Sequence, residues 1–125
     1  MNVVDSSAWL EYFANGPNAG RFASAVEDVE RLIVPSPCIL EVFKRVLQQR
    51  TEQEALQAVA LMRQGTIEEL TVEIALNAAR IGVSLKLPLA DSVVLATARK
   101  YQAVLWTQDS DFDGIENVKF FRKKR

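Results

Sequence analysis

The sequence of 125 residues contains no histidine and only one cysteine, Cys38. Histidine is the usual general base at neutral pH and the commonest zinc ligand. Its absence excludes Ser-His-Asp and Cys-His nucleophilic sites and nearly every zinc site. A single thiol also excludes a disulfide framework and is typical of the reducing cytoplasm, where we expect this protein to be located. Any enzymatic chemistry must therefore use carboxylates, hydroxyl groups, basic side chains or a hard cation bound by oxygen atoms.

Long apolar runs and a strong net charge are also missing. No apolar stretch approaches the roughly 20 residues that a membrane-spanning helix requires, and because the first residues have the pattern of a core strand we expect no signal peptide. The net charge of −1 indicates no general attraction for nucleic acid. With 49% hydrophobic and 25% charged residues, the composition is that of an ordinary globular protein, and the length predicts a single domain over residues 1–125.

Short apolar stretches alternate with amphipathic ones along the chain, which predicts alternating strands and helices. We expect strands at 2–4, 32–34, 66–70, 103–107 and 118–121, and helices at 6–13, 19–29, 36–50, 51–64, 71–82 and 88–101. Ser36 and Pro37 have the pattern of an N-cap and first turn, and Thr51–Glu54 that of a capping box. Strands this short and apolar predict an α/β fold with a mostly parallel sheet covered by helices on both faces.

Four acidic residues fall where one edge of such a sheet would gather them. Asp5 directly follows the first strand, Glu41 lies early in the helix after the second, Asp91 is near the start of an apolar helix, and Asp109 follows the strand 103–107. In open α/β sheets, functional sites lie beyond the carboxyl ends of the strands. Four carboxylates there repel one another unless a divalent cation neutralises them, and Mg²⁺ or Mn²⁺ fits best.

This arrangement predicts hydrolysis of a phosphodiester without histidine. A metal ion held by the four acids would activate a water molecule for in-line attack and stabilise the developing charge. Ser6 and Thr107 offer hydroxyl groups that would orient a carboxylate or a metal-bound water.

Each acid also has a structural interpretation. Asp5 would cap the following helix, and Glu41 would pair with Arg45 one turn later. Asp91 would be stabilised by the helix dipole, and Asp109 would be an ordinary turn residue. The location of all four on the same predicted edge favours the functional interpretation. The basic end, residues 121–125, either follows a nucleic-acid backbone or is a frayed, solvated tail.

Four segments, "VVDSSAWLEYF", "PSPCILEVFKR", "LPLADSVVLATARKY" and "VLWTQDSDFDGI", resemble in order the four acidic motifs of PIN-domain ribonucleases, and most of all VapC-type toxins of toxin–antitoxin pairs. The resemblance implies that Asp5, Glu41, Asp91 and Asp109 are the catalytic, metal-binding acids, that Thr107 is a hydroxyl group of the site, and that Asp111 is an assisting acid. It further implies a three-layer α/β/α sandwich, Mg²⁺- or Mn²⁺-dependent cleavage of RNA, homodimerisation, and inhibition by a cognate antitoxin.

Three other functions remain open at this stage. A PIN-type nuclease of RNA maturation would have the same site residues. A receiver-like phosphoacceptor domain has this size, but it would need paired acids after the first strand and an acceptor aspartate in mid-chain, and the sequence has neither. An inactive interaction module on the same fold would not need the four acids.

Overall fold

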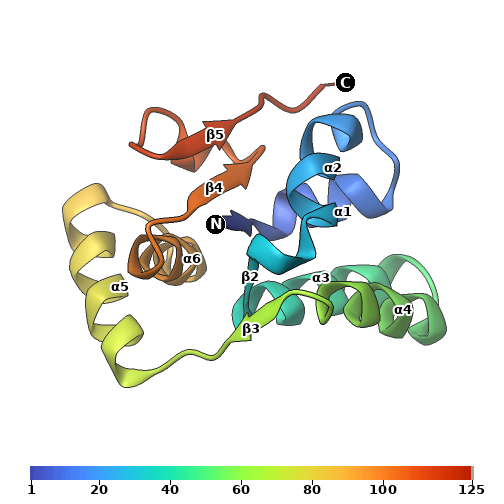
Figure 1. Ribbon diagram of the computed structural model, residues 1–125, viewed down its shortest axis with the longest axis horizontal. Helices are drawn as coiled ribbons and strands as arrows, with labels where there is room; N and C mark the ends of the chain where they lie inside the picture. The colour runs from blue at the N-terminus through green and yellow to red at the C-terminus, as the bar shows by residue number, and fades with distance from the viewer. Residues whose placement is uncertain (125) are drawn as a thin grey trace.

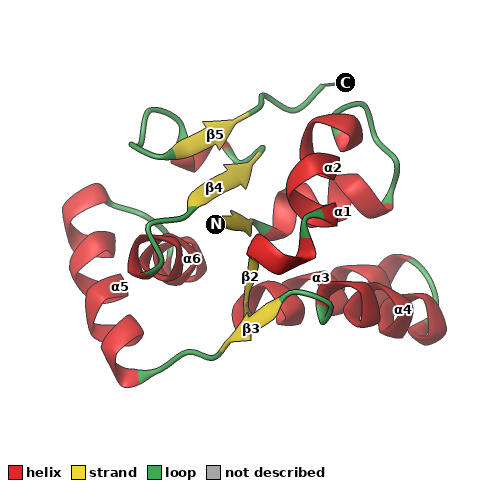
Figure 2. Cartoon of the chain, in the orientation of Figure 1, coloured by secondary structure: helices red, strands yellow, loops and turns green. Residues whose placement is uncertain are grey.

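The computed structural model describes residues 1–124, which form one five-stranded sheet with helices on both sides (Figures 1 and 2). The strands are β1 (Asn2–Val4), β2 (Leu32–Pro35), β3 (Thr66–Glu68), β4 (Val104–Thr107) and β5 (Val118–Phe120). The helices are α1 (Ser6–Phe13), α2 (Ala19–Glu27), α3 (Ser36–Gln49), α4 (Glu52–Met62), α5 (Val72–Leu85) and α6 (Leu89–Lys100). Two short 3₁₀ helices, η1 (Val29–Arg31) and η2 (Ser110–Phe112), complete the list.

All strand pairs are parallel, and the strand order is β3-β2-β1-β4-β5. The chain therefore builds the sheet outwards from β1 in one direction, through β2 to β3, and then crosses to the other side of β1 to add β4 and β5. Ligands of open α/β sheets bind outside the carboxyl ends of the strands where this reversal occurs. Here that position lies between β1 and β4, so the residues that follow Val4 and Thr107 border it.

The helices form the two outer layers of a three-layer sandwich, as predicted. Helix α6 contacts β1, β2 and β4, and α5 packs on its outer side. Helices α1 and α2 cover the opposite face, where they contact β4 and β1 (Figure 1). Helices α3 and α4 form a hairpin that packs against α1 and α6 at the carboxyl side of β2.

The core explains why the central strands are mostly apolar. Val3, Val4 and Leu105 are completely buried, because helices cover the sheet on both faces. Trp9 of α1 and Cys38 of α3 are also completely buried. In α6, all residues from Ser92 to Ala98 are buried, which confirms that the apolar helix is an interior one.

Most helix ends differ from the predicted bounds by one to three residues, and two of them have a clear physical reason. Pro35, not Ser36, is the N-cap of α3; the helix begins at Ser36, whose side chain forms no capping hydrogen bond. The sequence does not decide where the helix begins, because the N–H groups of the first turn have no hydrogen-bond partner within the helix. Pro37, which lacks an N–H, therefore fits either the first or the second helical position. Helix α5 continues three residues past Gly82 to a left-handed C-cap at Lys86.

Gly82 serves helix packing rather than helix termination. A Cβ atom at this position would lie 2.8 Å from Oγ of Ser92, so the glycine permits the close approach of α5 to α6. The capping box was predicted correctly at its first residue, because Thr51 accepts a hydrogen bond of 3.1 Å from the Glu54 N–H. Within the described chain no single helix is long and apolar enough to cross a membrane. Helices α5 and α6 have the required length and apolar composition only when taken together, and they are bent by 115° relative to each other.

Candidate active site

A cleft of about 810 Å³ opens at the carboxyl edge of the sheet and contains all four predicted acids. Asp5 comes from the end of β1, Glu41 from α3, Asp91 from the first turn of α6, and Asp109 from the segment after β4. They belong to distant parts of the sequence. The parallel sheet brings them together because the ends of β1 and β4 are adjacent and α3 and α6 begin at the same edge.

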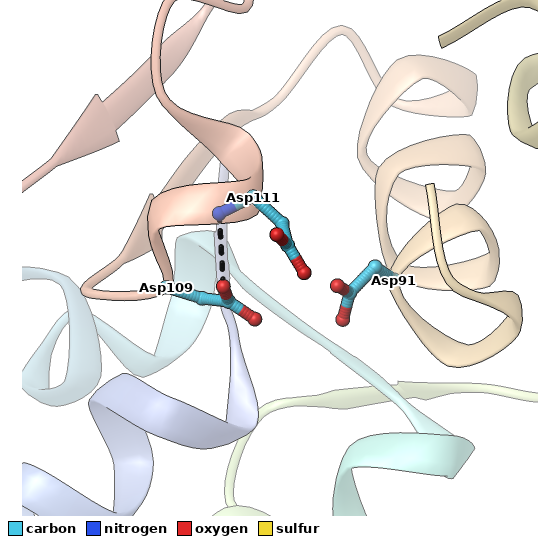
Figure 3. Close-up of side chains that lie close together, drawn as sticks. All are labelled: Asp91, Asp109 and Asp111. Atoms are coloured by element: carbon cyan, nitrogen blue, oxygen red, sulfur yellow. Dashed lines mark hydrogen bonds between the residues drawn. The ribbon is translucent and has the colours of Figure 1, made fainter. Parts of the chain in front are cut away.

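The tightest group of carboxylates consists of Asp91, Asp109 and Asp111. One oxygen atom from each lies within 4.8 Å of the other two, and the three side chains point towards one another (Figure 3). The Asp111 N–H donates a hydrogen bond of 2.9 Å to Oδ1 of Asp109 and so fixes the turn that presents both acids. Asp109 is therefore both a turn residue and a member of the cluster. Asp111, which the resemblance implies is an assisting acid, is a full member of this cluster.

Asp5 is held by two hydroxyl groups at the base of the cleft. Its carboxylate is 2% exposed, and its Oδ2 accepts hydrogen bonds from Ser7 (2.8 Å) and Thr107 (2.9 Å). Its side chain forms no N-capping hydrogen bond to α1, which argues against the capping interpretation. Burial raises the pKa of Asp5, the two hydroxyl groups oppose this rise, and the charge of Asp109 adds to it.

Glu41 is half-buried and is oriented by the other serine. Ser6 donates a hydrogen bond of 3.1 Å to Oε1 of Glu41, as expected of a hydroxyl group that orients a carboxylate. Burial raises the pKa of Glu41, and the charges of Asp5 and Asp109 raise it further. The two ion pairs within residues 1–124 are Arg31–Asp28 and Lys100–Glu68, so pairing of Glu41 with Arg45 is not supported.

Asp91 has a strongly perturbed carboxylate. Its pKa is raised from an ordinary value of 3.8 to about 7, chiefly because it is half-buried and then because of the charges of Asp5, Asp109, Asp111 and Glu41. Such a shift shows that the acids are close enough to repel one another through the cleft. Perturbed groups of this kind in a cleft are typical of functional sites.

Residues 3–118 match the model of the PIN domain. The chain belongs to the PIN-domain family. None of the curated protein sequences matches it. Among solved structures it is similar to a toxin–antitoxin complex from Klebsiella pneumoniae, with a TM-score of 0.81, 22% identity, and coverage of 98% of this chain and 100% of that one.

Two further structures have the same fold. VapC20 from Mycobacterium tuberculosis is described as a toxin that cleaves the sarcin–ricin loop. It has a TM-score of 0.76 at 16% identity, and the match covers 93% of this chain and 95% of the VapC20 chain. The DNA-bound VapBC from Salmonella typhimurium has a TM-score of 0.75 at 14% identity, with coverage of 98% and 97%. The solved PIN-domain structures of VapBC pairs thus show the same architecture over essentially the full chain.

One residue of this PIN-domain site was missed by the sequence analysis. Besides its bond to Asp5, Ser7 accepts a hydrogen bond of 3.2 Å from the Gln108 N–H, while Thr107 accepts one of 3.0 Å from the Asp109 N–H. These two hydroxyl groups tie the end of β1 to the segment after β4. The sequence shows two adjacent serines after Asp5, and only the geometry separates their roles, because Ser6 faces Glu41 and Ser7 faces Asp5.

The donor set fits a hard divalent cation. The cleft offers carboxylate and hydroxyl oxygens, which Mg²⁺ and Mn²⁺ prefer, and it lacks imidazole because the chain contains no histidine. Cys38 lies below the acids but is completely buried, and burial raises its pKa well above the ordinary value, so its thiol remains protonated. The raised pKa of Asp91 shows the electrostatic cost that a bound cation would relieve.

Proposed function

We propose that this PIN-domain protein is an endoribonuclease that depends on Mg²⁺ or Mn²⁺. The observation that carries the proposal is the convergence of the four predicted acids in one open cleft, with Asp111 beside two of them. Burial and the charges of the other three and of Asp111 raise the pKa of Asp91 to about 7. A purely structural cluster would pair such charges with arginine or lysine. Within the described chain neither of the two ion pairs involves an acid of the cleft.

The acids have distinct tasks in this proposal. Asp91 and Asp109, with Asp111 beside them, would hold the ion, and Asp5 and Glu41 would complete its surroundings. When bound, the ion supplies positive charge that polarises a water molecule and stabilises the phosphodiester under attack. The serine and threonine hydroxyl groups keep the Asp5 and Glu41 carboxylates in fixed orientations, so little reorganisation is needed during the reaction.

We infer that the nuclease is the toxin of a toxin–antitoxin pair and that an antitoxin segment binds in the same cleft. The similarity to VapBC structures supports a protein partner. Beyond the acids, the cleft continues between α1, α3 and α4 over apolar side chains: Leu10, Phe13, Ala14, Val46, Ala58 and Leu61. A groove in which apolar side chains lie among polar ones in this way suits a helical or extended peptide.

We further propose a cytoplasmic homodimer built from this single domain. Apolar side chains remain exposed on α5, where Val72 is 77% and Val83 is 83% accessible, and on Leu89 at the start of α6. Exposed apolar surface of this kind is a common feature of subunit interfaces.

The direct test is an RNA cleavage assay with purified protein. Fragments should form from total RNA with Mg²⁺ or Mn²⁺ and should disappear with a chelator. Asp109→Asn should abolish cleavage while its Oδ1 still accepts the Asp111 N–H and preserves the turn. Asp113→Asn is the matched control, because Asp113 is exposed in the same segment but does not line the cleft. Cleavage that persists in excess chelator, or in Asp109→Asn, would contradict the proposal.

A further inference from the structure

The chain after β5 is held against the sheet at Phe121. The Phe121 N–H donates a hydrogen bond of 2.9 Å to the carbonyl oxygen of Thr107, which extends the pairing of β5 with β4. Its ring stacks on Trp106 at 6.3 Å between centroids and meets the edge of Phe22 at 5.7 Å. The guanidinium group of Arg21 lies 5.1 Å from the centre of the same ring. The interpretation of this segment as a frayed tail is therefore not supported at Phe121.

A buried asparagine fixes the next residue. Asn18 is completely buried, and its Nδ2 donates one hydrogen bond of 3.1 Å to the carbonyl oxygen of Arg122 and another of 3.1 Å to Oε1 of Gln108. The Asn18 N–H in turn donates to Oε2 of Glu11 at 2.7 Å. Figure 1 shows the segment after β5 running towards α2, and Asn18 is the N-cap residue of that helix. The backbone at Arg122 is thus tied to the residue that directly precedes Asp109.

These contacts place Lys123 on the wall of the acidic cleft. It lines the same cleft as Asp5 and Asp109, whereas its neighbours Arg122 and Lys124 do not. The other basic residues of the wall are Arg45 and Arg50, on α3 and at its end. Lys123 takes part in neither of the two ion pairs found within residues 1–124, so its ammonium group is available to an incoming anion.

A nucleic acid that enters this cleft needs such a positive charge. The chain has a net charge of −1, and six acidic residues line the cleft, so the charge of the chain as a whole provides no long-range attraction for RNA. A lysine is a compact charge on a flexible stem, which suits contact with one phosphate of a mobile strand.

We propose that Lys123 binds a backbone phosphate of the single-stranded RNA substrate beside the acidic cluster, and that the anchored C-terminal segment exists to present it there. This inference rests on the proposed nuclease function and adds a substrate contact to it. The anchor matters because a lysine on a free tail would lose conformational entropy on every binding event, whereas the segment up to Arg122 is already ordered.

Steady-state cleavage of a fluorescein-labelled single-stranded RNA, measured with Mg²⁺ at several salt concentrations, tests this contact. Lys123→Ala should raise KM about three- to tenfold with little change in kcat, and it should reduce the salt slope of log(kcat/KM) by about 0.7, the value for one phosphate contact on a single strand. Lys123→Glu should have a larger effect, and Lys123→Arg should retain activity. Lys124→Ala and Lys124→Glu are the matched controls and should leave both parameters close to wild type.

The outcomes separate this contact from the nuclease function itself. Equal effects at Lys123 and Lys124, unchanged kinetics of Lys123→Glu, or a loss confined to kcat would each overturn the role of Lys123 while leaving the nuclease intact. Unchanged RNA kinetics combined with weaker inhibition by an antitoxin peptide would assign Lys123 to the protein partner and would also overturn it. Absence of metal-dependent cleavage by the wild type would refute both proposals. Melting temperatures of the alanine and arginine variants at position 123 should match that of the wild type, because the Lys123 side chain makes no hydrogen bond or ion pair within the described residues. Lys123→Glu should melt slightly lower, because it adds a negative charge to the acidic cleft.

Discussion

Replacing Asp91 by asparagine should stabilise the metal-free protein while it abolishes metal-dependent activity. Asp91 is a half-buried carboxylate that faces Asp5, Glu41, Asp109 and Asp111, and these surroundings raise its pKa to about 7. Asparagine has nearly the same shape but no charge. The substitution therefore removes a repulsion that the folded protein tolerates only for the sake of the site.

The magnitude follows from the pKa. A rise from 3.8 to about 7 corresponds to about 4 kcal/mol at 1.36 kcal/mol for each pH unit. Because water reaches about half of the group, screening reduces this to about 2 kcal/mol. The folded state binds more protons than the unfolded state between these two pKa values. The stability of the wild type should therefore fall as the pH rises from about 4 to about 7 and then remain low.

Urea denaturation followed by circular dichroism, in the presence of a chelator, measures the effect. At pH 8, Asp91→Asn should be more stable than the wild type by about 2 kcal/mol, or by roughly 5 to 10 °C in Tm for a domain of this size. At pH 4.5, less than one unit above the ordinary pKa of aspartate, the two proteins should differ much less than at pH 8. The wild-type Asp91 is then still protonated in the folded state, and the fall in stability has only begun. Asp113→Asn, in the same segment but exposed, should show neither change.

The result that would refute this reasoning is a variant less stable than the wild type at pH 8. It would mean that the Asp91 carboxylate is a structural partner in the first turn of α6 and not a repelled ligand. Equal stability differences at both pH values would show that the amide itself, and not the removal of charge, alters the packing.

Two further predictions concern the metal and the packing of the sheet. Addition of Mn²⁺ should raise the Tm of the wild type by mass action. The free energy of unfolding should increase by about 2.7 kcal/mol at a Mn²⁺ concentration one hundred times Kd. Thermal scans without any shift would argue against a metal site. Gly65→Ala should cost about 1 to 3 kcal/mol in urea denaturation, because the new Cβ would lie 2.9 Å from the Leu32 carbonyl oxygen and 3.0 Å from Val34. Gly20→Ala, with nothing within 4 Å, should not destabilise the protein, and an equal loss at both glycines would contradict this argument.

The sequence predicted the fold and the convergence of the four acids at one edge of the sheet because both follow from strong local signals. Short apolar stretches lack the alternation of apolar and polar residues that a strand with one solvent-exposed face has. They therefore predict strands that are covered on both faces. Once the sheet is parallel, the residues after the strands share one edge, so Asp5, Thr107 and Asp109 are all expected there. The adjacency of β1 and β4 then makes them neighbours. The hydrogen bonds of Thr107 to the Asp5 carboxylate and from the Asp109 N–H confirm that adjacency.

Other features depend on distances that no local pattern encodes. The order of the strands, with β1 between β2 and β4, decides which acids are nearest neighbours, and the sequence does not specify it. The position of Gly82 inside α5 follows from the approach of Ser92 across a helix pair. Ser6 and Ser7 are identical in type and adjacent in sequence, so their division between Glu41 and Asp5 follows only from the direction of α1.

The acidic cluster illustrates how function and stability oppose each other in this fold. Asp5 and Asp91 both have raised pKa values, so each carboxylate makes the metal-free protein less stable above the ordinary pKa of aspartate. The hydroxyl groups of Ser7 and Thr107 compensate Asp5 only in part, because burial is the larger influence on its pKa. The remaining stability must come from the apolar core around β1 and β4, which lies directly below the site. A site of this kind therefore requires a sheet covered on both faces, and a thinner fold with one exposed face would have less core to offset the same repulsion.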